Sequence, residues 1–103
     1  MKIINFFSPN CDKKKRTLNS VKFIIFHYTG MQSERESIQK LCNPNSKVSC
    51  HYLINRKGKI FKLIQDKYVA WHAGKSCWGE YKNLNKNSIG IELVNKGHKF
   101  GYT

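Results

Sequence analysis

Two short apolar runs place the strongest constraint on the fold of this 103-residue chain. Residues 21–27 are rich in β-branched and aromatic side chains, and residues 88–95 carry Gly90 and Glu92 among aliphatic neighbours. Runs of this length and composition are typical of strands that are covered on both faces of a sheet. We therefore predict two buried strands, with Gly90 allowing a neighbouring group to approach closely.

A helix and a β-hairpin are predicted between these strands. Ser33 and Glu36 fit a capping box, and an Asn-Pro pair further on would end a helix of about ten residues. Residues 48–55 and 60–65 are extended apolar-rich runs, and Gly58 between them suits the positive φ of a hairpin turn. The order strand, helix, hairpin, loop and strand predicts an α/β fold with a mixed sheet flanked by helices.

The length of the chain limits it to one compact domain. Residues 1–20 indicate a polar, basic N-terminal arm that packs locally, residues 21–103 form the main unit, and residues 75–87 suggest an exposed polar loop. No apolar run approaches the roughly 18 residues of a membrane span, which excludes a transmembrane helix. The first residues do not fit a secretory signal, so we expect a cytoplasmic protein.

The charge and the cysteines say less about function. Lys and Arg number 19 against 6 Asp and Glu, giving a net charge of +13 that favours an anionic partner. The lysines are scattered, and we find no nucleic-acid-binding motif, so a basic nucleic-acid binder is a competing hypothesis that rests on charge alone. The cysteine spacings match no zinc or thioredoxin pattern, and the expected cytoplasmic location favours free thiols at Cys11, Cys42, Cys50 and Cys77.

A few polar residues are candidates for chemistry. His27 ends an apolar run, where a histidine is more often a hydrogen-bonded structural residue than a metal ligand. Burying Glu92 among aliphatic residues costs several kcal/mol unless a cation, a metal or hydrogen bonds compensate; the alternative is a strand edge facing water. His72 follows a tryptophan and would line a pocket or pack in a core, whereas we expect His51 to be structural and His98 to be solvated.

Four blocks of the sequence stand in an order known from one family. They are I-F-H-Y-T at 25–29, S-C-H-Y-L-I with a following R-K-G at 49–58, W-H-A-G at 71–74 and N-S-I-G-I-E-L at 87–93. Together they resemble the zinc-dependent N-acetylmuramoyl-L-alanine amidases (type 2 amidases), which include amidase-type phage lysozymes and peptidoglycan recognition proteins. The resemblance covers roughly residues 20–100 and is nearest to the bacterial branch that acts on anhydromuropeptides.

The resemblance implies roles for particular residues. His27 would be the first zinc ligand, a role that suits a neutral imidazole at a strand end. Glu92 would be the base that activates water for attack on the amide between N-acetylmuramic or anhydromuramic acid and L-alanine, in peptidoglycan or its fragments. The groove that holds the stem peptide and sugar would be lined by Tyr28, Trp71, His72 and Ala73.

The sequence also departs from the family pattern. The other zinc ligands and the oxyanion donor come from a block that would lie beyond Thr103, and the resemblance places none of the other histidines at the metal. We therefore expect the N-terminal portion of an amidase domain, truncated at its C-terminal side, with an apolar face left open and the remainder absent or supplied by a second chain. A non-catalytic peptidoglycan- or muropeptide-binding fragment is the alternative. Relatives work in the cytoplasm or the envelope, so the periplasm or cell envelope is the alternative location.

Overall fold

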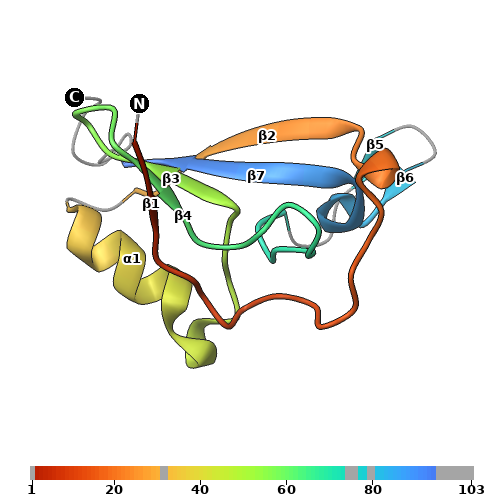
Figure 1. The fold of residues 1–103 in the computed structure, drawn as a ribbon, viewed down its shortest axis with the longest axis horizontal. Coiled ribbons are helices and arrows are strands. Elements are labelled where there is room, and N and C mark those ends of the chain that lie inside the picture. The colour runs from red at the N-terminus through yellow and green to blue at the C-terminus, as the bar shows by residue number, and fades with distance from the viewer. Residues whose placement is uncertain (1, 31–32, 74–76, 79–80, 95–103) are drawn as a thin grey trace.

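The computed structural model describes residues 2–30, 33–73, 77–78 and 81–94. Five strands form one mixed sheet in the order β1-β4-β3-β7-β2, in which only the β3–β4 pair is antiparallel (Figure 1). The helix α1 (Glu34–Cys42) lies on one face of this sheet. The predicted α/β fold with a mixed sheet is confirmed. The strands of the sheet are β1 (Ile3–Asn5), β2 (Phe23–Tyr28), β3 (Tyr52–Ile54), β4 (Ile60–Lys62) and β7 (Ser88–Leu93).

The two apolar runs form neighbouring parallel strands, but only one of them is central. β7 pairs with both β3 and β2, as predicted for a buried strand. β2 pairs with β7 and is an edge strand of the described sheet, and one of its faces is exposed, so the prediction of a strand covered on both faces is wrong. Alternate side chains of β2 point away from α1, and three of them are largely exposed, at 63%, 61% and 58% for Ile24, Phe26 and Tyr28. Composition alone does not reveal whether an apolar strand has neighbours on both sides.

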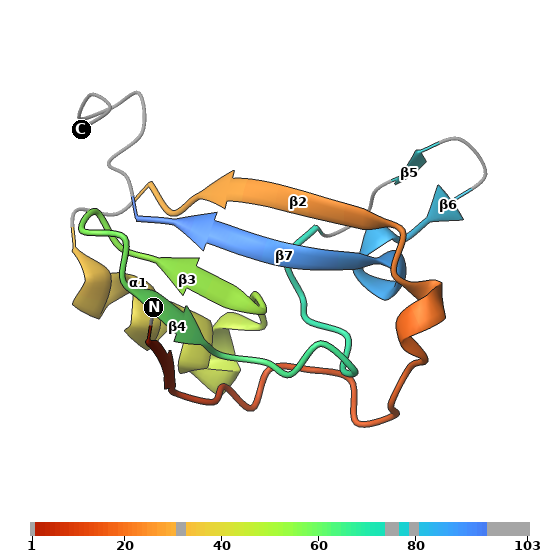
Figure 2. The same cartoon turned by 45° about the horizontal axis from the view of Figure 1, so that its top comes forward.

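The helix begins and ends where the sequence predicts. The Ser33 side chain accepts a hydrogen bond from the Glu36 backbone N–H at 3.1 Å, which is the capping arrangement expected. Asn43 follows the last turn, and Pro44 opens a short 3₁₀ helix, η2 (Pro44–Ser46). Leu41 on the sheet-facing side of α1 is 3% exposed and joins the core. Figure 2 shows that α1 lies against the part of the sheet that contains β3 and β4.

The predicted hairpin is also confirmed. β3 and β4 pair antiparallel with Leu53 opposite Phe61, and both side chains are buried in the core beneath α1. Gly58 in the connecting turn has φ of 83°, a conformation that glycine adopts without steric cost. The Asn55 side chain accepts hydrogen bonds from the backbone N–H groups of Lys57 and Lys59, which closes the turn.

Two segments, one at the N-terminus and one before β7, contain more structure than the sequence indicates. The N-terminal residues supply β1, which pairs in parallel with β4, and a 3₁₀ helix, η1 (Leu18–Ser20). The segment predicted as a polar loop contains an antiparallel pair of short strands, β5 (Cys77–Trp78) and β6 (Tyr81–Lys82), followed by η3 (Leu84–Asn87).

Among the described helices, none has the length and apolar character needed to cross a bilayer. The thiols of Cys11, Cys42 and Cys50 are free, as expected.

Candidate active site

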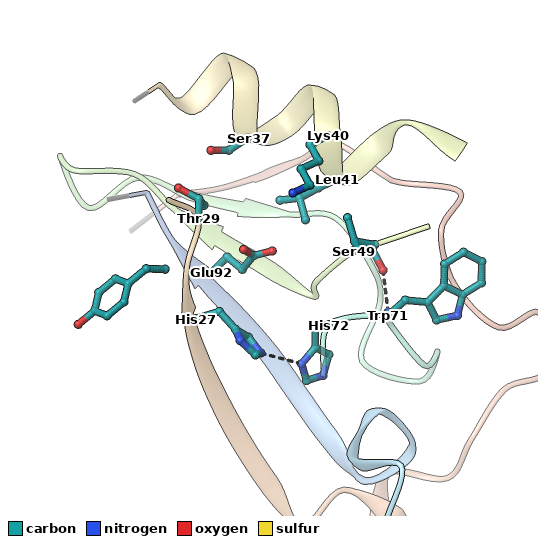
Figure 3. Close-up of a pocket in the computed structure, with 11 residues that line it drawn as sticks. His27, Thr29, Ser37, Lys40, Leu41, Ser49, Trp71, His72 and Glu92 are labelled. Carbon is teal, nitrogen blue, oxygen red and sulfur yellow. Dashed lines mark hydrogen bonds between the residues drawn. The ribbon is translucent and has the colours of Figure 1, made fainter. Parts of the chain in front are cut away.

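A pocket of about 210 Å³ opens between α1 and the sheet, on the side of the sheet that α1 covers (Figure 3). Its walls come from the ends of β2 and β7, from α1, and from the segments before β3 and after β4. The carboxyl ends of parallel strands commonly form such sites, because the loops that follow them diverge. The lining residues are His27, Tyr28, Thr29, Ser37, Lys40, Leu41, Val48, Ser49, Trp71, His72 and Glu92.

His27 and Glu92 lie directly opposite each other on the paired strands β2 and β7. Both strands run in parallel, and residues in register share a face, so both side chains point toward α1 and into the pocket (Figure 3). Glu92 therefore does not stand at a sheet edge in water, which was the alternative that the sequence left open. The structure brings together the two residues to which the amidase resemblance assigns metal binding and base catalysis.

The surroundings of Glu92 suit a carboxylate that takes up a proton. Burial raises the pKa of Glu92 above its ordinary value, while the cationic Lys40 and a hydrogen bond from the Cys50 thiol act in the opposite direction. Cys50 itself is 0% exposed, burial raises the pKa of its thiol so that it stays protonated, and its Sγ also lies 3.1 Å from the Tyr52 carbonyl as a donor. A carboxylate whose pKa moves toward neutrality is a better proton acceptor near pH 7 than an ordinary glutamate.

The His27 ring contacts a second histidine of the pocket. His27 Nε2 lies 3.1 Å from His72 Nδ1, and His72 Nε2 lies 2.9 Å from Ser88 Oγ. Burial lowers the pKa of His27, and burial, with smaller contributions from His27, His51 and Arg16, lowers the pKa of His72 to about 3. Both rings are therefore neutral near pH 7, the form in which imidazole binds a metal. The ring of His72 lies so close to Gly90 that a Cβ there would be 2.5 Å from it, which confirms the predicted close approach.

The Trp71–Ala73 segment is fixed at several points. The Trp71 indole N–H donates to Asp12 at 2.8 Å, and its backbone N–H donates to the Ser49 hydroxyl at 2.9 Å. The backbone N–H groups of His72 and Ala73 both donate to the side-chain oxygen of Asn85. Trp71 and His72 line the pocket, whereas Ala73 lies beside them and is not among the lining residues described. Their role in substrate binding stays a prediction.

Tyr28 borders the pocket from the end of β2. It follows His27 in the strand, so its side chain points to the opposite face, and it is 58% exposed. A direct contact between the phenol and a substrate in the pocket thus needs a substrate that extends around the strand end. The predicted role of Tyr28 in substrate binding is untested.

His51 is structural, in line with the sequence-based expectation. The side chain is 0% exposed, its Nδ1 accepts from the Gly90 backbone N–H at 3.0 Å, and its Nε2 donates to the Tyr68 carbonyl at 2.8 Å. Because both ring nitrogens are committed to the backbone, His51 is not available to a metal. His98 lies outside the described residues.

Several residues of the pocket were not predicted from the sequence. Ser37 and Lys40 reach it from α1, and Ser49 reaches it from the segment before β3. Helical spacing identified the apolar side of α1 but gave no sign that Lys40 would reach the same pocket as Glu92. The serines had no signal, because their positions follow from the way α1 lies across the sheet.

The described donors fit part of a zinc site. His27 offers a neutral imidazole, and Glu92 offers a carboxylate beside it, which suit a ligand and a base at a zinc-activated water. Within residues 2–30, 33–73, 77–78 and 81–94, no group of three or more His, Cys, Asp or Glu side chains is placed to hold a metal ion. The predicted ligand role of His27 is compatible with this geometry and stays a prediction.

Comparison with known proteins identifies the family. Residues 17–103 match the family described as N-acetylmuramoyl-L-alanine amidase. The chain belongs to this family. An Escherichia coli relative, the N-acetylmuramoyl-L-alanine amidase AmiD, is 38% identical over 84 residues, which cover 75% of this chain and 29% of AmiD.

Solved structures of amidases share the fold. A crystal structure of an AmpD selenomethionine derivative matches with a TM-score of 0.75 and 25% identity, over 90% of this chain and 61% of that chain. AmiD from E. coli, in complex with the substrate anhydro-N-acetylmuramic acid-L-Ala-D-γ-Glu-L-Lys, matches with a TM-score of 0.67 and 36% identity, over 76% of this chain and 32% of that chain. The chain thus spans less than two thirds of the length of these relatives.

Proposed function

We propose that this chain carries the zinc-binding and base half of an N-acetylmuramoyl-L-alanine amidase site. The reaction would be hydrolysis of the amide between N-acetylmuramic or anhydromuramic acid and L-alanine, in peptidoglycan or its fragments. The single observation that carries the proposal is the placement of His27 and Glu92 in register, side by side in one pocket. Membership of the amidase family and the muropeptide bound by the AmiD relative support the choice of substrate class.

Two residues of this chain, His27 and Glu92, would have separate roles in the reaction. When bound, a zinc ion supplies Lewis-acid polarisation of the scissile carbonyl and acidifies water. His27 would hold that ion through a ring nitrogen, and Glu92 would accept the proton of the attacking water and pass it to the leaving amine. The raised pKa of Glu92 suits both halves of that transfer, because the same carboxyl must gain a proton and then release it.

A muropeptide-binding fragment without catalysis is the second candidate. It needs the pocket but not a complete set of three metal ligands, and the described residues contain no such set. A binding role would use the same pocket walls, including Trp71 and His72, without a bound ion. The two candidates differ in whether zinc and turnover accompany muropeptide binding.

The test is hydrolysis of an anhydromuramyl-tripeptide by the purified chain with equimolar zinc, followed by chromatography of the released peptide. Glu92→Gln should lower turnover by at least about 100-fold while zinc content stays unchanged, because it removes the base and keeps the shape. Glu36→Gln makes the same change at an exposed position of α1 and should leave turnover unchanged. A Glu92→Gln chain of wild-type rate contradicts the base role.

The metal role of His27 is tested separately by elemental analysis. His27→Ala should reduce bound zinc to background, and unchanged zinc stoichiometry contradicts the ligand role. A wild-type chain that binds the tripeptide without zinc and without releasing peptide supports the binding fragment and refutes the amidase proposal.

A further inference from the structure

A continuous line of hydrogen bonds runs from the pocket into the backbone. It joins His27 Nε2 to His72 Nδ1 at 3.1 Å, His72 Nε2 to Ser88 Oγ at 2.9 Å, and Ser88 Oγ to the Leu84 carbonyl at 2.7 Å. Each imidazole nitrogen is either a donor or an acceptor, and the positions of the ring protons follow from the partners. The donor and the acceptor of each hydrogen bond therefore follow from the one group in the series whose role is fixed.

The fixed end is the Leu84 carbonyl, which only accepts. Ser88 must donate its single hydroxyl proton there, so Ser88 Oγ accepts from His72 Nε2. A neutral His72 with its proton on Nε2 has a lone pair on Nδ1, so His27 Nε2 is the donor in the remaining bond. A neutral His27 with its proton on Nε2 has its lone pair on Nδ1, and that nitrogen is the one left to bind a metal.

The surroundings hold His72 in this orientation. Gly90 leaves room for the ring, since a Cβ at that position would lie 2.5 Å from His72 Cγ and Cδ2. The His72 backbone N–H is bound to the Asn85 side chain at 3.1 Å, so the main chain is fixed as well. The ring thus has a fixed backbone, a serine partner and a glycine that makes room for it.

We propose that His72 is a positioning residue, which fixes the Nε2–H tautomer of His27 and presents His27 Nδ1 to the zinc ion. This inference rests on the proposed function for the presence of zinc. The tautomer itself is a property of the metal-free chain. This proposal gives His72, the histidine of the W-H-A-G block, a role different from the substrate contact that the family resemblance implies.

The first experiment is the imidazole ¹⁵N NMR spectrum of the metal-free chain at pH 7. Both His27 and His72 should show a protonated Nε2 and an unprotonated Nδ1. A His27 ring with its proton on Nδ1 overturns the proposal. Titration with cadmium, a spectroscopic substitute for zinc, should then shift His27 Nδ1; a direct shift of His27 Nε2 together with His72 Nδ1 would mean that the two rings share the ion, and it also overturns the proposal.

A matched pair of variants tests the positioning role. His72→Asn places an amide oxygen close to the position of Nδ1 and can still accept from His27, whereas His72→Leu has a similar volume and no acceptor. Loss of such a partner typically weakens metal binding 10–100-fold, so we expect that loss for His72→Leu and a smaller one for His72→Asn. Equal zinc affinity in the two variants overturns the proposal. If wild-type chain binds no zinc, the proposed function fails, while the metal-free spectrum still decides the tautomer.

Discussion

Asn10 provides the sharpest test of how the N-terminal segment supports the pocket. Its side chain is 2% exposed, and its Nδ2 donates to the carbonyls of Leu41, Asn43 and Val48 at 3.3, 2.9 and 2.9 Å. Leu41 and Val48 line the pocket, so one amide ties together the end of α1 and the segment that leads to β3. Asn10→Ala removes all three contacts and keeps the backbone bonds of residue 10.

The expected cost follows from which acceptors keep other donors. The Leu41 and Asn43 carbonyls still accept from the hydroxyls of Ser8 and Ser46, whereas the Val48 carbonyl loses the Asn10 amide. Two hydrogen bonds at about 1 kcal/mol each, with a further 1–3 kcal/mol for a part-buried acceptor left unpaired, bring the loss to roughly 3–5 kcal/mol.

Urea unfolding followed by circular dichroism measures this loss. With a slope of about 2 kcal/mol per molar urea, the midpoint should fall by roughly 1.5–2.5 M at unchanged slope. Asn19→Ala, the same substitution at an exposed position, should move the midpoint very little. A midpoint for Asn10→Ala that matches that of Asn19→Ala would refute the claim that this amide holds the N-terminal segment to α1.

Three other predictions concern stability. Burial lowers the pKa values of His51 and His72, so the unfolded chain binds more protons than the folded chain below pH 6.5. The free energy of unfolding of the metal-free protein should therefore fall between pH 6 and pH 5, by up to about 1.4 kcal/mol per pH unit for each histidine. Urea midpoints that do not change over this range contradict the prediction. Ser33→Ala removes the cap of α1 and should cost about 1 kcal/mol, with Ser33→Asp restoring most of it in the same urea assay. Leu53→Ala empties a fully buried position of the core and should cost about 2–5 kcal/mol, and a cost below that of Ser33→Ala would show that the core beneath α1 is loosely packed.

Local signals in the sequence predicted the elements that depend on local chemistry. At Ser33, Gly58 and Gly90 the residue type itself favours a particular local structure. These structures are a helix cap, a turn with positive φ and a strand that a neighbouring ring approaches closely. The family resemblance assigned His27 and Glu92 to one site but not to paired positions, because no local pattern places two distant strands in register. The structure supplies that register.

The features that the sequence did not reveal depend on distant partners. β1 has only three residues, and its pairing with β4 joins segments more than fifty positions apart. The partners of Asn10 lie 31 to 38 residues away, and they are backbone carbonyls, whose availability no side-chain pattern records. The edge position of β2 is a property of strand order, which the apolar run leaves open.

The spacing of the S-I-G-I-E-L block explains why a single strand supplies so much of the site. Side chains alternate along a strand, so Ser88, Gly90 and Glu92 share the face toward α1. Ser88 holds the His72 ring, Gly90 leaves space for that ring, and Glu92 faces the pocket beside His27. Ile89, Ile91 and Leu93, which alternate with them, share the opposite face with the exposed side chains of β2. A shift of the β7 register by one residue would therefore remove the serine partner, the space for the ring and the base at once, so the register of β7 against β2 is the structural condition on which the whole proposed site depends.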